Sequence, residues 1–391
     1  MDFLLKPLSL YIHWPFCLSK CPYCDFNSHV RQTFDEEAWQ EGLLHELERY
    51  ADHIKTWEQP YTLQSIFFGG GTPSLMQPQT VERLIDKALQ LWGRDPSLEI
   101  TLEANPNSVE VQRFQALRQA GINRLSLGIQ AFNDTALKQL GRQHSTQEAL
   151  KALEIACDIF SRVSFDLIYA RPGQTLQDWQ EELIKALSFG TEHLSLYQLT
   201  IEPGTAFASL YNRGELILPD EERSADLFEM TQAVMNNSQR PAYEISNHAK
   251  KGAECRHNLT YWTYQDYIGI GPGAHGRLTC GPLKKQATRQ KKSPEGWLRS
   301  IQDQGHGDAE IIQLSLQDQL KEQLLMGLRL TEGIPLETLV MPLEQAFADK
   351  IINHERWHHL CQNQYLDVSQ DRIKATDSGR QRLQAVLDYI L

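Results

Sequence analysis

The chain has 391 residues, enough for one large or two smaller domains with a substantial core, and its composition is ordinary for a globular protein. Its 38 basic and 50 acidic residues leave a formal net charge of -12, which disfavours nucleic acid or an anionic membrane as the main partner. No apolar run approaches the roughly 20 residues of a membrane span. The first six residues do not resemble a signal peptide, so we expect a cytoplasmic protein.

Short β-type runs alternate with longer amphipathic segments over the first two-thirds of the chain. The predicted strands are residues 8–13, 65–68, 99–103, 124–128, 164–168 and 193–198. The predicted helices are residues 35–55, 81–92, 109–120, 147–160 and 176–188. This alternation predicts an α/β fold with a parallel sheet, and six such units suit a partial (β/α)6-type barrel. In such sheets the functional site lies at the carboxyl ends of the strands.

The rest of the chain is predicted to form two further segments. After a barrel core at residues 1–200, residues 201–309 are a less regular extension rich in aromatic side chains, and the basic run at 284–292 favours a solvated loop. From residue 310 the pattern is helical again, with a predicted hairpin at 364–374 and a helix at 383–391. We expect residues 310–391 to form a small winged-helix-like α+β module.

Three of the seven cysteines crowd into eight residues, in the segment Cys17-Leu18-Ser19-Lys20-Cys21-Pro22-Tyr23-Cys24. This segment follows the first predicted strand, and thiolates are soft ligands suited to iron–sulfur clusters or zinc. A structural zinc ion wants four protein ligands, so a fourth would have to come from His13, His29 or a distant cysteine. A cubane cluster on three cysteines instead leaves one iron open for a small molecule. The spacing favours the cluster, and a zinc-stabilised interaction protein is the weaker alternative.

Residues around these cysteines carry a family resemblance. Cys-x-x-x-Cys-x-x-Cys after the first strand resembles the radical S-adenosylmethionine (SAM) superfamily. The segments Tyr-Ile-His-Trp-Pro-Phe at 11–16 and Gly-Gly-Gly-Thr-Pro-Ser at 69–74 are similar to the group of anaerobic coproporphyrinogen III oxidases and haem chaperones of the HemW type. The resemblance implies a [4Fe–4S] cluster on Cys17, Cys21 and Cys24, with SAM bound at the open iron.

The resemblance also implies a set of SAM contacts. They are Tyr11, Tyr23, Gly70, Gly71, Thr72, Glu103, Gln130, Arg142 and Asp166. A glycine-rich turn can offer backbone N–H and C=O groups to an amine and a carboxylate. Each position has a structural alternative: Glu103 as a helix cap, Arg142 in a surface ion pair, Asp166 as a buried carboxylate. Arg171 departs from the family pattern, and we expect it near the cofactor face, paired with a carboxylate or a haem propionate.

Three features separate the oxidases from the chaperones. The oxidases carry a cysteine two residues after the third cluster cysteine, where this chain has Phe26, and they have a long arm before the first strand, where only ten residues precede Tyr11. The segment His257-Asn258-Leu259-Thr260-Tyr261-Trp262 matches the H-N-x-x-Y-W motif of the HemW type. Histidine and tyrosinate are haem ligands and aromatic faces suit a macrocycle, so His257, Tyr261 and Trp262 are the candidate haem residues.

Other residues receive structural interpretations. From the residues alone, the H-N-x-x-Y-W segment is better interpreted as a turn followed by core aromatics, and it is the family resemblance that favours haem binding. Cys255 is a minor candidate for haem contact, and Cys157 is predicted to be a core cysteine. His275 either lines the haem pocket or bonds to backbone.

The leading hypothesis is a haem chaperone that binds the cluster, SAM and haem and transfers haem to an acceptor protein. The resemblance implies an acceptor among membrane cytochromes or respiratory enzymes. The alternative is an enzyme, an oxygen-independent coproporphyrinogen III oxidase. It would use an external electron donor and a radical from SAM to decarboxylate its porphyrinogen substrate oxidatively.

Overall fold

A single large sheet organises the computed structural model, which describes residues 5–57 and 60–391. Residues 1–4, part of the segment that we expect not to be a signal peptide, lie outside the described residues. The sheet has eleven strands in the order β13-β12-β11-β10-β1-β4-β5-β6-β7-β8-β9. The sheet contains the six predicted strands as consecutive parallel neighbours, which confirms the predicted partial barrel; they are β1 (Lys6–Trp14), β4 (Tyr61–Gly70), β5 (Arg94–Ala104), β6 (Arg124–Gln130), β7 (Arg162–Tyr169) and β8 (His193–Gln198).

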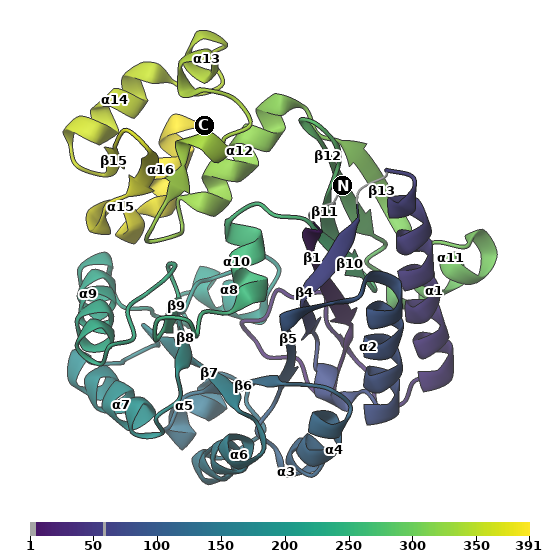
Figure 1. Cartoon of the computed structure of the whole chain (residues 1–391). Coiled ribbons are helices and arrows are strands. Elements are labelled where there is room, and N and C mark those ends of the chain that lie inside the picture. The colour runs from purple at the N-terminus through teal and green to yellow at the C-terminus, as the bar shows by residue number, and fades with distance from the viewer. Residues whose placement is uncertain (1–4, 58–59) are drawn as a thin grey trace.

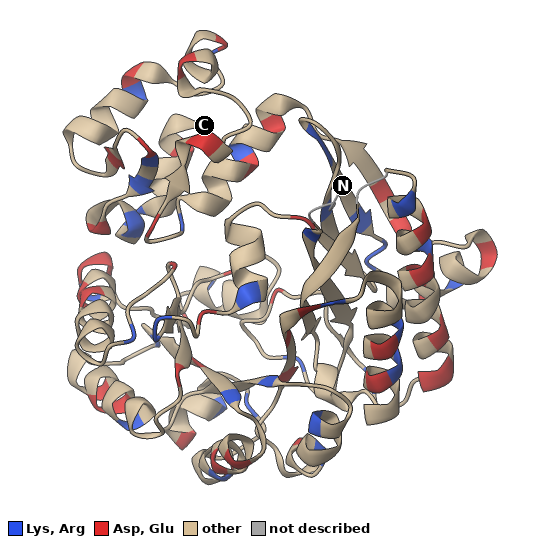
Figure 2. Ribbon diagram, viewed as in Figure 1, with Lys and Arg blue, Asp and Glu red and all other residues tan. Residues whose placement is uncertain are grey.

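Helices connect these strands and cover the outside of the sheet (Figure 1). They are α1 (Glu36–Lys55), α2 (Pro78–Trp92), α3 (Ser108–Val111), α4 (Phe114–Gln119), α5 (Asp134–Gln139), α6 (Thr146–Ile159) and α7 (Leu176–Ser188). The single helix predicted at 109–120 is therefore two short helices. Each long helix buries its apolar stripe against the sheet, and Figure 2 shows acidic residues along α1, α2 and α9 (Glu221–Asn237).

The middle segment is more regular than the sequence indicated. It contributes α8 (Ala206–Asn212), α9, α10 (Arg256–Trp262) and α11 (Pro294–Gln304), and the strands β9 (Asn247–Ala249), β10 (Tyr267–Ile270), β11 (His275–Gly281), β12 (Lys284–Gln290) and β13 (Asp308–Gln313). Strand β10 pairs in parallel with β1, and β11 to β13 continue the sheet antiparallel. The sheet thus extends across residue 200. The domain boundaries at 200 and 309 stay a prediction.

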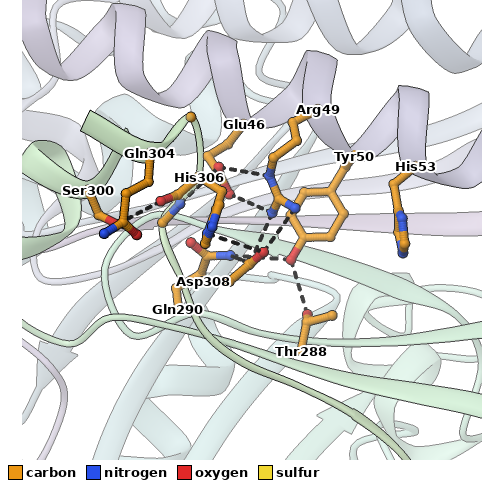
Figure 3. A network of polar contacts seen from close by, with 12 residues as sticks. Glu46, Arg49, Tyr50, His53, Thr288, Gln290, Ser300, Gln304, His306 and Asp308 are labelled. Atoms are coloured by element: carbon orange, nitrogen blue, oxygen red, sulfur yellow. Dashed lines mark hydrogen bonds and ion pairs between the residues drawn. The ribbon is translucent and has the colours of Figure 1, made fainter. Parts of the chain in front are cut away.

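The loop prediction for residues 284–292 is wrong, because most of this basic run is strand β12. Its polar side chains are satisfied inside the protein: Lys285 is buried and pairs with Asp266 at 3.4 Å. Figure 3 shows the rest of the attachment, a polar network between α1 and the β12–β13 region. Arg49 bridges Glu46 and Asp308, while Tyr50 donates a hydrogen bond to Thr288 at 3.1 Å. Partners distant in sequence therefore make a hydrophilic strand stable.

The C-terminal module has its own apolar core, in which Leu324, Trp357 and Leu387 are buried. Its elements are α12 (Leu316–Gly327), β14 (Ile334–Pro335), α13 (Leu343–Ala348), α14 (His354–Gln362), β15 (Leu366–Val368), β16 (Arg372–Ala375), α15 (Asp377–Gln381) and α16 (Leu383–Ile390). Strands β15 and β16 pair antiparallel, which confirms the predicted hairpin. No helix in the described part of the chain is long and apolar enough to span a membrane.

The structure corrects the interpretation of Cys157 and shows that the partner of Arg171 is a protein carboxylate. Cys157 is exposed on α6 and is not a core cysteine. Arg171 is buried in a bidentate ion pair with Glu182 of α7, with Nη2 and Oε2 2.5 Å apart. Because this carboxylate already neutralises the guanidinium, Arg171 serves the packing of α7 and does not pair with a ligand.

Candidate functional site

The cysteine segment is held at the carboxyl end of β1. Residues Phe16–Cys17 form the short strand β2, which pairs in parallel with β3 (His29–Val30) and closes the loop between them. Within the loop, the Cys24 N–H donates to the Cys21 carbonyl at 3.1 Å. The loop therefore curls over the end of the sheet, as the spacing of the cysteines predicts.

The three thiols are free and each has a polar neighbour. The Thr72 hydroxyl donates to Cys17 Sγ at 3.5 Å, and Arg142 Nη1 donates to Cys21 Sγ at 3.3 Å. Cys24 Sγ lies 3.9 Å from the Ser28 hydroxyl. Burial raises the pKa of the Cys17 and Cys24 thiols, and the neighbouring cysteine sulfurs raise it further. A positively charged guest would lower these pKa values again, so binding of metal here releases protons.

The glycine turn after β4 braces the cysteine loop. Gly71 N–H donates to the Trp14 carbonyl at 2.6 Å, and Thr72 N–H donates to the Phe16 carbonyl at 2.8 Å. A Cβ at residue 71 would lie 2.6 Å from the Phe16 carbonyl oxygen, so only glycine allows this approach. Contrary to our expectation, these two N–H groups are bonded to backbone and do not face a ligand.

Two acidic side chains lie in the carboxyl halves of β5 and β7. Glu103 accepts a hydrogen bond from Gly70 N–H at 3.3 Å, and burial together with the charge of Asp166 raises its pKa to about 8. Burial also raises the pKa of Asp166, to about 6, against the opposing effect of its hydrogen bond from Ser195. Neither carboxylate has an ion-pair partner within 4 Å among the described residues. Such acids are prepared to receive a cationic ligand.

Arg142 connects the acidic wall to the cysteines. Its Nη2 donates to Asn105 Oδ1 at 2.6 Å and to the Gly128 carbonyl at 2.7 Å, while Nη1 reaches Cys21. It is therefore not in the surface ion pair that we considered as an alternative. The sequence analysis did not select Asn105. Its position directly after β5, at the carboxyl end of a parallel strand, is the signal that could have identified it. Tyr197, near the end of β8, was missed in the same way.

These groups surround one cavity of about 400 Å³ at the carboxyl ends of the parallel strands. Every predicted cluster and SAM residue except Tyr11 lines it; they are Cys17, Cys21, Tyr23, Cys24, Gly70, Gly71, Thr72, Glu103, Gln130, Arg142 and Asp166. The structure thus brings together residues that span 150 positions of sequence. Their agreement in space supports the predicted site more strongly than any single motif.

A second cavity of about 340 Å³ adjoins the first and contains Tyr11. Gly70, Glu103 and Phe26 line both cavities. The remaining wall is largely aromatic and includes Tyr261 and Tyr267, whose ring centroids lie 4.7 Å apart at near right angles. Phe26 is 57% exposed at the junction. A large apolar side chain at a cavity mouth favours an apolar ligand with a flat face.

The predicted haem residues do not all face this cavity. Tyr261 lines it, whereas His257 lies behind Tyr261 and is 1% exposed. His257 Nε2 pairs with the Tyr261 hydroxyl at 2.7 Å, and Nδ1 pairs with the Ser65 hydroxyl at 2.9 Å. Burial lowers the His257 pKa to about 3, so the ring is neutral. Trp262 stacks under the Arg329 guanidinium at 4.5 Å and lines neither cavity.

The donor set fits an iron–sulfur cluster better than a single ion. Among the described residues, no three His, Cys, Asp or Glu side chains converge on one metal position. His13, a candidate fourth zinc ligand, uses both ring nitrogens, on Tyr11 and on the Asn27 carbonyl. Three reduced thiols spread around a cavity suit a larger guest, held by several metal atoms.

Fold and site together define an α/β protein with three free thiols around a cavity at the carboxyl ends of its parallel strands. The Radical SAM superfamily model matches residues 11–185, and the HemN C-terminal domain model matches residues 314–382. The chain is 35% identical to heme chaperone HemW of Escherichia coli, over 99% of both chains. It belongs to the radical SAM superfamily, and membership implies a [4Fe–4S] cluster and SAM.

Two further comparisons describe its relatives. The mitochondrial radical S-adenosyl methionine domain-containing protein 1 of Danio rerio is 38% identical over 83% of this chain and 73% of its own length. The solved structure of coproporphyrinogen III oxidase (HemN) from Escherichia coli superposes with a TM-score of 0.79 and 21% identity, over 98% of this chain and 90% of that chain. The likeness to the oxidase covers the fold, including the C-terminal module.

Proposed function

We propose that this protein is a haem chaperone, which binds haem beside its cluster and passes it to an acceptor protein. The observation that carries the proposal is the aromatic second cavity, with Phe26 exposed at the position where the oxidases have a cysteine. Relatives named heme chaperone HemW support it. An open cavity holds a macrocycle by one face and leaves the other accessible to an acceptor.

The residues of the first cavity would hold the cluster and SAM. Cys17, Cys21 and Cys24 would ligate iron, and Glu103 would accept hydrogen bonds from the SAM amine. A cluster with an open iron supplies, when reduced, the electron that cleaves SAM. Arg142 would hold the Cys21 sulfur in place and keep its charge compensated. Tyr261, held by His257, would form part of the wall of the haem cavity.

A haem titration of the anaerobically reconstituted protein tests the proposal, and we expect one haem per chain. The same sample should not convert coproporphyrinogen III with SAM and a reductant present. Turnover of that substrate would contradict the chaperone function. So would a titration in which the added haem keeps the absorbance spectrum of free haem. Turnover would establish the oxidase instead.

Replacing Phe26 with serine should weaken haem binding without changing the cluster. Loss of one aromatic contact face costs about 1–2 kcal/mol, or roughly 5- to 30-fold in Kd. The titration measures this change, and iron content checks the cluster. Leu283→Ser is the matched control, because Leu283 is a comparably exposed apolar side chain outside both cavities. Equal affinities in all three proteins would remove Phe26 from the haem site.

A further inference from the structure

A haem ligand in the second cavity needs a ring nitrogen or hydroxyl that is free to meet iron. His257 has hydrogen-bond partners on both nitrogens and lies behind the wall. The Tyr261 hydroxyl is bonded to His257, and burial together with neighbouring negative groups raises the Tyr261 pKa well above its usual value. His13 also has both nitrogens occupied. None of these three groups is available as a ligand without breaking the packing that holds the wall.

His275 differs from these residues in each respect. It is the first residue of β11, it is exposed, and its side chain lines the second cavity. Neither ring nitrogen has a hydrogen-bond or ion-pair partner among the residues that the structure describes. Burial and the nearby Arg277 and Arg289 lower its pKa, which keeps the ring neutral and able to coordinate a metal.

The backbone around His275 is firmly placed. Gln290 N–H donates to the Ala274 carbonyl at 2.8 Å, and Gly273 N–H donates to the Lys291 carbonyl at 2.9 Å. His275 lies opposite Arg289 in the β11–β12 pair. Since the turn before β11 is tied to the neighbouring strand on both sides, the imidazole is presented from a rigid sheet rather than from a free loop.

One of the cations beside His275 suits a propionate of haem. Arg277 is neutralised by Glu322 at 2.7 Å and Arg289 by Glu310 at 3.1 Å. Lys292 is exposed, lies close enough to influence the charge of His275, and has no ion pair among the described residues. A cation without a partner at the rim complements a carboxylate that remains near water, while Phe26 and Tyr261 complement the apolar ring.

We propose that His275 is the axial ligand of the haem iron in the second cavity, with Phe26 against the macrocycle and Lys292 beside a propionate. This assignment rests on the proposed function. In it, His257 is a positioning residue that holds Tyr261 and does not touch iron. The H-N-x-x-Y-W segment thus builds the wall of the haem site, and the ligand comes from a different strand.

The test compares haem spectra of the reconstituted wild type with those of four histidine variants, one of which is a control. His275→Ala should weaken haem binding roughly tenfold or more and shift the Soret band, and added imidazole should restore the wild-type band. His275→Met should give a third spectrum, because a thioether replaces the imidazole. His257→Ala should weaken binding while the band stays at the wild-type wavelength. His358→Ala, an exposed histidine in the C-terminal module, is the control and should match the wild type.

The outcomes separate this assignment from the proposed function. A wild type that binds no haem overturns the proposed function and the assignment with it. A wild type that binds haem, with both His275 variants keeping its spectrum, overturns the assignment alone. If the Soret band of His257→Ala is shifted and added imidazole restores it, His257 is the iron ligand. That result would contradict the hydrogen bonds that occupy both of its ring nitrogens. Circular dichroism of each variant shows that the fold is intact.

Discussion

Cys21→Ala is expected to leave the protein without its cluster after anaerobic reconstitution. A cubane with one iron reserved for SAM already depends on three thiolates, and two cannot hold it. The remaining cysteines are scattered, and Cys255, which lies closest in sequence to the haem motif, is buried where it donates to Glu99 rather than facing the cavity. Among the described residues, no other thiol lines the first cavity to replace the lost ligand. Iron and sulfide per chain should therefore fall to near zero.

The matched control is Cys157→Ala, which removes an exposed thiol on α6 outside that cavity. Its iron and sulfide content should equal that of the wild type. Zinc bound in place of iron and sulfide by the reconstituted wild type would contradict the cluster and revive the structural zinc site. A Cys21→Ala protein that keeps full iron and sulfide would show that the cluster lies elsewhere.

Local patterns predicted the parallel half of the sheet because each of its strands is apolar and each helix is amphipathic. All six predicted strands fall within β1, β4, β5, β6, β7 and β8. The antiparallel half could not be found this way. Strand β12 reads Lys-Lys-Gln-Ala-Thr-Arg-Gln, and its buried Thr288 and Gln290 are satisfied by Tyr50, Trp297 and Asp308. Tyr50 comes from helix α1, far away in the chain, so no window of local sequence contains all three partners.

The candidate site, like the sheet, could be predicted from the sequence only in part. The cysteines and the residues at strand ends were identifiable, because topology brings the carboxyl ends of parallel strands to one place. The haem candidates were chosen from a contiguous motif, and contiguity does not say which way a side chain points. On α10, His257 faces the sheet and Tyr261 faces the cavity, four residues apart. His275 had no sequence signal beyond its glycine-rich turn, and its free imidazole is visible only in the structure.

Glu103→Gln should weaken SAM binding and change its pH dependence. In the unliganded protein the pKa of Glu103 is about 8, so the carboxyl is mostly protonated at neutral pH. If the carboxylate pairs with the SAM cation, binding expels this proton, and affinity rises about tenfold per pH unit until the pH exceeds that pKa. Glutamine keeps the shape and a hydrogen-bond acceptor but has neither the charge nor the proton. We expect a loss of about 2 kcal/mol above pH 8, roughly 30-fold in Kd.

Isothermal titration of the reconstituted protein with SAM between about pH 6 and 9 measures this effect. Other groups, including the SAM amine, titrate in this range, so the informative quantity is the difference between proteins. The slope of log affinity against pH should be smaller by about one proton in Glu103→Gln than in the wild type or in Glu181→Gln, a control on the exposed surface of α7. Identical slopes would mean that Glu103 stays ionised without SAM or does not contact it.

The contribution of Glu103 to the free energy of unfolding should fall as pH rises, which is opposite to the trend in SAM affinity. This measurement tests the raised pKa of Glu103 in the absence of SAM. Because the folded-state pKa of Glu103 lies above the usual value of 4.5, the folded protein binds more protons than the unfolded chain between pH 4.5 and about 8. The contribution of Glu103 to the free energy of unfolding therefore falls as pH rises through that window. Glu103→Gln should remove this decrease, and saturating SAM should oppose it by placing a cation beside the carboxylate. Denaturant unfolding at pH values across the window would reveal both changes, and a wild type whose stability rises there as much as the variant's would contradict the raised pKa.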